Sequence, residues 1–74
     1  HTNAQIWAKS AMWIIARIYE MGQLVGTEDY ISKEIGIYKD TSAAVLHDLI
    51  DAKIIKRTKT GNSIQKTASV YIFS

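Results

Sequence analysis

The first third of the chain carries apolar residues at the 3.6-residue period of an α-helix. The stripe consists of Trp7, Ala11, Ile14, Ile15 and Ile18. This spacing places the side chains on one face, which is expected to be buried. Asn3 is typical of a helix N-cap, and Gly22 is typical of the position just after a helix. The pattern therefore predicts a long first helix between Asn3 and Gly22.

A second, shorter helix is predicted after Thr27. Thr27 is a suitable N-cap, and Glu28 and Asp29 occupy the first turn, where the helix dipole favours acidic side chains. The residues predicted to be buried are Tyr30, Ile31 and Ile35. Gly36 is expected to end this helix in the left-handed conformation that glycine adopts at low cost, with Ile37 packing the turn.

A third helix follows, with Asp40 or Thr41 as its predicted N-cap. Its apolar positions at helical spacing are Val45, Leu46, Leu49, Ile50 and Ala52. The second and third helices each have one apolar face, and a short turn around Gly36 joins them. This is the hydrophobic pattern of a helix-turn-helix.

The remaining apolar segments are β-branched and alternate with polar residues, as strands do. Leu24 and Val25 predict a very short strand that Gly26 ends, and residues 54–60 and 69–73 predict two longer ones. A tight turn at Gly61-Asn62 would pair Ile55 with Ala68. A longer loop would place residues 54–55 opposite residues 70–72, and we favour it because it buries more apolar surface. The chain is thus predicted to be α+β, with three helices and a small antiparallel hairpin.

This order of elements resembles the winged helix-turn-helix superfamily, as found in small bacterial and archaeal regulators and in phage or plasmid replication proteins. The resemblance rests on the segment Ile31-Ser32-Lys33-Glu34-Ile35-Gly36-Ile37, on Thr41, Leu46, Leu49, Ala52 and the pair Ile54-Ile55, and on the closing segment Ala68-Ser69-Val70-Tyr71-Ile72-Phe73. It covers nearly the whole chain. Residues 1–74 are accordingly expected to form a single winged-helix domain. Because the chain begins with His1, we expect it to be a fragment of a longer protein.

The resemblance implies a DNA-binding role in transcription regulation or DNA replication. In this family the third helix enters the major groove, and the hairpin, or wing, contacts the DNA backbone. By position, the reading face would be Tyr38, Lys39, Asp40, Thr41, Ala43, Ala44 and His47. Of these residues, only Lys39 could make the common contact to guanine, and Asp40 repels phosphate.

Composition limits the chemistry of the chain. It has 74 residues, no cysteine and only two histidines, His1 and His47. These numbers exclude a disulfide framework, a thiolate metal site and the usual zinc sites. No metal or other cofactor is expected. The lack of cysteine is typical of a cytoplasmic protein, and no apolar stretch reaches the ~18 residues that a membrane span needs.

Charge is unevenly distributed. Overall the net charge is +2, but residues 20–51 contain seven acids and two lysines, a net −5, whereas residues 52–74 contain five bases and no acid, a net +5. The basic residues of the second segment are Lys53, Lys56, Arg57, Lys59 and Lys66. They could neutralise ~3–5 phosphates of double-stranded DNA. Alternatively, lysines protect an exposed strand edge from aggregation; we favour the first interpretation.

The predicted DNA-binding residues combine the start of the third helix with the wing. They are Tyr38, Lys39, Thr41, His47, Lys56, Arg57, Lys59, Asn62 and Lys66. An alternative function is a winged-helix module for protein–protein interaction or oligomerisation in a larger assembly, without direct DNA readout. The acidic third helix favours that alternative, and the basic hairpin disfavours it.

The first helix has apolar residues outside its buried stripe. Ile6 and Trp13 lie beside Arg17 on the predicted outer face. Trp is enriched at interface hot spots, so we predict a partner interface at Ile6, Trp13 and Arg17, for a homodimer or for the rest of a parent chain. In the alternative, Arg17 stacks on Trp13 within the chain as a cation–π pair.

No enzymatic activity is predicted. His47 and Asp48 are sequence neighbours, which do not face one another on a helix. The pair Asp48 and Asp51 is best interpreted as solvated acids on an exposed face. No serine has a partner base, and the glycines do not form a phosphate-binding loop.

Overall fold

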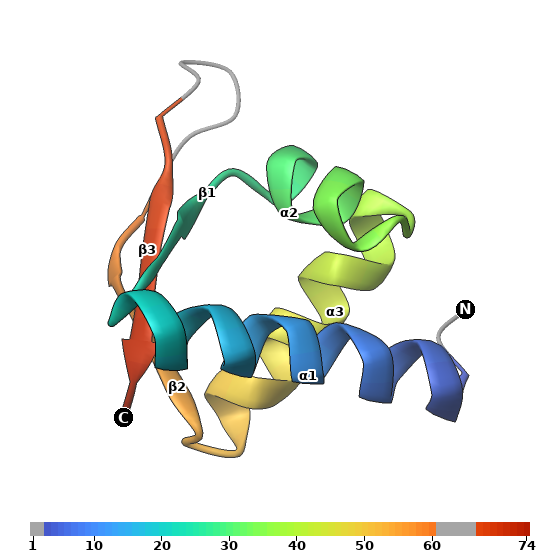
Figure 1. Cartoon of the computed structure of the whole chain (residues 1–74), viewed down its shortest axis with the longest axis horizontal. Coiled ribbons are helices and arrows are strands. Elements are labelled where there is room, and N and C mark those ends of the chain that lie inside the picture. The colour runs from blue at the N-terminus through green and yellow to red at the C-terminus, as the bar shows by residue number, and fades with distance from the viewer. Residues whose placement is uncertain (1–2, 61–66) are drawn as a thin grey trace.

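The computed structural model describes residues 3–60 and 67–74 and confirms the predicted α+β class (Figure 1). It contains three helices and a three-stranded antiparallel sheet. In chain order the elements are α1 (Ala4–Met21), β1 (Leu24–Gly26), α2 (Glu28–Ile35), α3 (Lys39–Asp51), β2 (Ile55–Lys59) and β3 (Ser69–Phe73).

Side chains cap the first two helices as predicted. The Asn3 side chain accepts a hydrogen bond from the backbone N–H of Ile6 at 2.9 Å, and the Thr27 hydroxyl accepts one from Tyr30 at 3.0 Å. Each bond satisfies an N–H group that has no partner inside its helix.

The predicted N-cap of α3 is wrong. The helix begins at Lys39, so Asp40 and Thr41 lie inside it, and the N-cap Tyr38 makes no side-chain capping bond. Instead, the backbone carbonyl of Tyr38 accepts from the N–H groups of Thr41 and Ser42, both at 3.1 Å. The buried Ser42 hydroxyl also donates to the Lys39 carbonyl at 2.8 Å. Backbone bonds therefore start the helix without a polar cap.

A left-handed residue stands at the end of each helix or just beyond it. Gly22 (φ 80°) and Gly36 (φ 84°) follow α1 and α2 at the predicted positions, whereas Ala52 after α3 is right-handed and Lys53 comes next at φ 60°. After α3, the Lys53 N–H donates to Ile50 O at 2.9 Å and the Ile54 N–H donates to Leu49 O at 3.0 Å. This pair of bonds is the Schellman motif, in which glycine is the usual left-handed residue.

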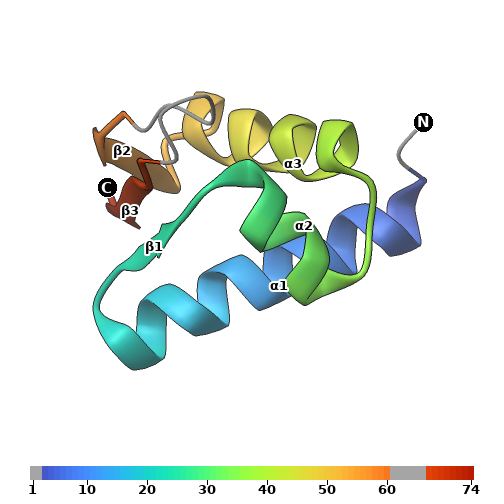
Figure 2. The same cartoon turned by 90° about the horizontal axis from the view of Figure 1, so that it is seen from above.

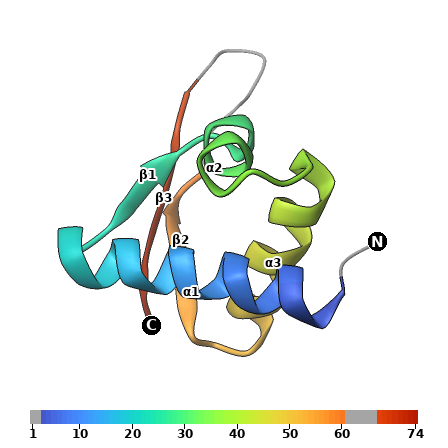
Figure 3. The ribbon, with the colours of Figure 1, turned by 45° about the vertical axis from the view of Figure 1, so that its right-hand side comes forward.

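The sheet has the strand order β1-β3-β2, so β3 is central and β2 is an edge strand. Ile55 lies opposite Phe73, not opposite Ala68, which rules out the tight-turn register and favours the longer loop. The register predicted for that loop is wrong, because residues 70–72 lie opposite Lys59, Arg57 and Lys56, and Ile54 is 42% exposed. Residues 61–66 of that loop lie outside the described residues. In Figures 1 and 3, β2 and β3 run side by side at one end of the helices.

The core lies where the three helices and the inner face of the sheet meet. Its buried apolar residues are Ala11, Ile14, Ile18, Leu24, Ile31, Ile35, Val45, Leu46, Leu49, Ile55 and Tyr71. Two predicted core residues are wrong: Tyr30 is 43% exposed, and Ala52 is exposed after the last turn of α3. The Tyr30 ring lies over Gly26, where a Cβ atom would come within 2.6 Å of it. The Tyr30 ring therefore covers the backbone of β1 at Gly26 and lies at the surface instead of in the core.

Candidate nucleic-acid interface

Strand β2 presents a run of exposed, mostly basic side chains. Ile55 at its start is buried, and the four positions that follow are all exposed: Lys56, Arg57, Thr58 and Lys59. Because β2 is at the edge of the sheet, one side of its backbone is also unpaired in the sheet. This strand is the most basic described segment of the chain.

A β-bulge orients the lysines of β2. Lys56 lies opposite Ile72, Arg57 opposite Tyr71, and Lys59 opposite Val70. Neighbouring residues of β3 point to opposite faces of the sheet, so Lys59 shares the outer face with Lys56. Regular alternation would have placed Lys59 on the inner face with Arg57. The irregularity between Arg57 and Lys59 thus gathers both lysines on one surface.

Arg57 is held by an aromatic ring. Its guanidinium carbon lies 5.3 Å from the centroid of Tyr71, which is fully buried. Contacts of this kind are cation–π interactions, and they leave the edge N–H groups of arginine available for other acceptors. Arg57 remains exposed at its strand position. Sequence reasoning missed this contact because it depends on the register that pairs the two residues across the hairpin.

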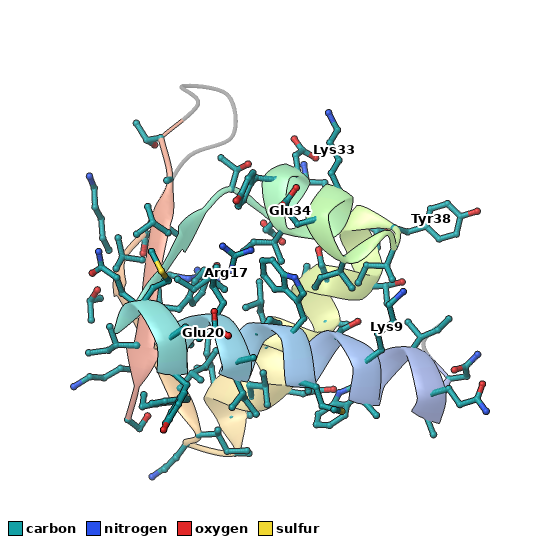
Figure 4. All side chains as sticks on the ribbon, viewed as in Figure 1. Lys9, Arg17, Glu20, Lys33, Glu34 and Tyr38 are labelled. Carbon is teal, nitrogen blue, oxygen red and sulfur yellow. The ribbon has the colours of Figure 1, made fainter. Side chains whose placement is uncertain are left out.

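The residues predicted at the start of α3 do not all reach the surface. Tyr38 is 85% exposed and projects away from the molecule (Figure 4). Lys39 is exposed, with its Nζ 3.6 Å from Asp29 Oδ1. Thr41 is only 7% exposed, so its placement on a reading face is wrong. Helical spacing explains this, because Thr41 is one turn before Val45 on the buried side of α3.

His47 and its neighbours lie further along α3. His47 is exposed, and its Nδ1 is 3.2 Å from Asp51 Oδ2, one helical turn away. Of the other predicted reading-face positions, Asp40 and Ala44 are exposed and Ala43 is half-buried. This face therefore offers few donors for base edges.

Asp48 has a partner that the sequence did not reveal. The indole Nε1–H of Trp7 donates to Asp48 Oδ2 at 2.9 Å, joining α1 to α3. Asp48 and Asp51 are both exposed, as predicted. The bond to Trp7 is an additional role of Asp48 that the sequence did not predict.

Two further predicted residues, Asn62 and Lys66, lie outside the described residues. The structure thus places three of the predicted wing residues, Lys56, Arg57 and Lys59, and places them together on one strand. In Figure 2, β2 and α3 lie along the side of the molecule opposite α1. The candidate interface is therefore defined here as β2 with the neighbouring exposed side of α3.

The predicted partner patch on α1 is used within the chain. Trp13 is half-buried against the core, and the Arg17 guanidinium lies 4.7 Å from its ring centroid. Arg17 also lies 3.9 Å from Glu34 Oε1 of α2 (Figure 4). Ile6 is half-buried and lines a hollow of about 450 Å³ with Ile37 and Thr41. The alternative in which Arg17 stacks on Trp13 is confirmed. Ile6, Trp13 and Arg17 are all half-buried, and the partner interface stays a prediction.

The described part of the chain comprises residues 3–60 and 67–74. In that part of the chain, no group of three or more His, Cys, Asp or Glu side chains is arranged to hold a metal ion. The helices there are also too short or too polar to cross a membrane.

Comparison of the chain with protein-family models, with curated proteins and with solved structures gives no significant match. The functional argument therefore depends on the geometry and charge of the described residues.

Proposed function

We propose that this chain is a winged-helix DNA-binding module that acts in a transcription regulator or a replication protein. The observation that carries the proposal is β2, where three of four consecutive exposed residues are basic. No acidic residue occurs anywhere in residues 52–74. A surface of this kind attracts the phosphate backbone of DNA.

The arrangement of the elements supports the same function. The chain order is α1-β1-α2-α3-β2-β3, and the short strand β1 joins the hairpin through β3. β2 lies beside the C-terminal end of α3, and Tyr38 and Lys39 lie at the other end of that helix (Figure 2). A duplex that contacts both must therefore run along the length of α3. The exposed Thr60 adds a neutral hydroxyl that can donate to DNA phosphates, whereas the Thr58 hydroxyl donates to the Val70 carbonyl at 3.4 Å.

In the proposed mode of binding, most contacts are to the phosphate backbone of the DNA and few are to base edges. Lys56 and Lys59 supply mobile point charges, and Arg57 supplies a planar group already oriented by Tyr71. The exposed α3 residues Asp40 and Ala44 contribute little to base recognition. We therefore expect binding that depends strongly on salt and weakly on DNA sequence.

A second candidate is a protein-interaction module without DNA readout. The observation that favours it is the hollow between α1 and the α2–α3 turn, which Ile6, Ile37 and the exposed Tyr38 line. Partly apolar hollows bind apolar side chains of partners. We rank this function second because it assigns no role to the basic residues of β2.

A pair of single substitutions tests the first proposal. Lys59→Ala removes one charge from β2, and Lys33→Ala removes one exposed charge from α2 as the matched control. We expect Lys59→Ala to weaken duplex binding roughly three- to tenfold at low salt and to reduce the slope of log K against log salt by ~0.9. Fluorescence-anisotropy titrations measure both quantities. Equal effects of the two substitutions would mean that overall charge, not β2, determines binding.

A further inference from the structure

The side of α1 that faces away from the rest of the chain carries an uncovered apolar stripe. Met12 is 69% exposed and Tyr19 is 81% exposed, and Ala8 and Ala16 are also exposed. Their spacing of i, i+4, i+8 and i+11 places all four on one face of the helix. We refer to these four residues as the outer stripe. It lies about 100° around the helix from Trp13, which packs on the core.

The outer stripe has two small and two large side chains in a particular order. Along the helix the order is small, large, small, large: Ala8, Met12, Ala16, Tyr19. If a second α1 runs in the opposite direction with its two-fold axis near residue 14, Met12 lies opposite Ala16 of the second copy and Tyr19 lies opposite Ala8. Each large residue then meets a small one, as close helix packing requires. A parallel arrangement would instead place Met12 against Met12 and Tyr19 against Tyr19.

The charged residues beside the outer stripe favour the same antiparallel direction and the same register of the two helices. Lys9 and Glu20 flank the outer stripe on the same side of α1, toward its two ends (Figure 4). Both are exposed. In the antiparallel arrangement Lys9 of each copy lies level with Glu20 of the other, to within about 1.5 Å along the axis. In a parallel two-fold pair, the Lys9 and Glu20 side chains of one copy would lie on the opposite side of the contact from those of the other copy, so these pairs could not form.

From this agreement of size and charge, we propose that the outer stripe of α1 binds a second copy of this chain as an antiparallel, two-fold symmetric helix pair. The contact is isologous, so each complementary pair occurs twice. It differs from the patch of Ile6, Trp13 and Arg17, which the chain uses internally. It also lies on a different side of α1 from Trp7, which bonds to Asp48 of α3, so the dimer contact does not use that side of the helix.

The size of the contact sets its strength. Helix α1 has 18 residues and is therefore ~27 Å long. One helix pair of this length buries less surface than the ~1,200–2,000 Å² of standard stable interfaces. We therefore expect a reversible dimer with a dissociation constant of roughly 10–100 µM.

Sedimentation equilibrium of the 74-residue chain over ~1–500 µM tests the proposal. The wild type is expected to follow a monomer–dimer equilibrium, and Met12→Glu is expected to be monomeric throughout. Lys9→Glu and Glu20→Lys should each raise the dissociation constant, by about tenfold or less because the pairs are exposed. The double variant Lys9→Glu/Glu20→Lys restores opposite charges in the antiparallel register and should recover the wild-type constant.

Mixing the two single variants gives the most specific result. Lys9→Glu carries two acids at these positions and Glu20→Lys carries two bases, so the antiparallel register favours the heterodimer over both homodimers. Thermal unfolding by circular dichroism checks that every variant is folded. A wild type that stays monomeric at ~500 µM would overturn the proposal. The proposal would also be overturned if Met12→Glu dimerised like the wild type. The same holds if mixing Lys9→Glu with Glu20→Lys gave no excess of heterodimer over the two homodimers.

Discussion

Lys53 occupies a backbone position at which glycine is usual. Its φ of 60° closes the Schellman motif after α3 and leads the chain into β2. The left-handed conformation costs a non-glycine residue about 1–2 kcal/mol. A lysine at this position brings a further positive charge to the start of the basic strand, so we interpret the strain as a cost of DNA binding.

Substitutions at Lys53 separate its two effects. Lys53→Gly should raise the free energy of unfolding by about 0.5–1.5 kcal/mol, because it relieves the strain, and should weaken DNA binding. Lys53→Ala keeps the strain and loses the charge, so it should weaken DNA binding without gaining stability. Urea unfolding and anisotropy titration measure the two properties. If Lys53→Gly binds DNA as tightly as the wild type, Lys53 lies outside the interface.

At the residue scale, the sequence predicted the backbone conformation of individual residues better than it predicted their burial and contacts. Asn3, Thr27, Gly22 and Gly36 cap their helices as expected, because such preferences depend on the adjacent backbone alone. The burial of Thr41 and the indole bond to Asp48 were missed. The position of Thr41 one turn before Val45 is a local signal of its burial. The indole bond depends on how α1 packs against α3, and residues 41 positions apart carry no local signal of their contact.

The hydrogen bond from the Trp7 indole to the Asp48 carboxylate connects α1 to α3. It joins the first turns of α1 to the second half of α3, and Trp7 also packs against the core. We expect Asp48→Ala to lower the free energy of unfolding by about 1 kcal/mol relative to Asp51→Ala. Asp51 is the matched control, because it is an aspartate of the same helix whose exposed pair with His47 contributes little. Equal stability of the two variants would show that the indole bond does not hold α1 to α3.

At the element scale, the hydrophobic period predicted three helices and three strands in the right order. Apolar burial correctly favoured the longer hairpin loop and the burial of Ile55, but it did not give the register, in which Ile55 lies opposite Phe73. The bulge after Arg57 could not be predicted, since β2 is polar beyond Ile55 and no buried face defines its alternation. That bulge decides which side chains share a surface. The candidate site could therefore be predicted from the sequence less well than the fold.

At the scale of the whole molecule, opposite charges occupy different regions. All seven acids lie within residues 20–51, and the exposed bases of β2 lie at one end of the molecule beside α3. Local pairs offset some of the acids: Lys39 with Asp29, and Arg17 with Glu34. The modest net charge of +2 therefore conceals a strongly basic strand, which gives the chain a defined side for an anionic partner.

The central claim is that β2 and its neighbours bind the DNA backbone. The most direct test is a fluorescence-anisotropy titration of the chain with a mixed-sequence duplex, and with the matching single strand, at ~50 and ~200 mM salt. With three to four phosphates contacted, affinity for the duplex should fall roughly 50- to 150-fold between these concentrations, from a micromolar dissociation constant. No binding at ~50 mM salt, or binding that salt does not change, would contradict the account and leave β2 as a protected sheet edge.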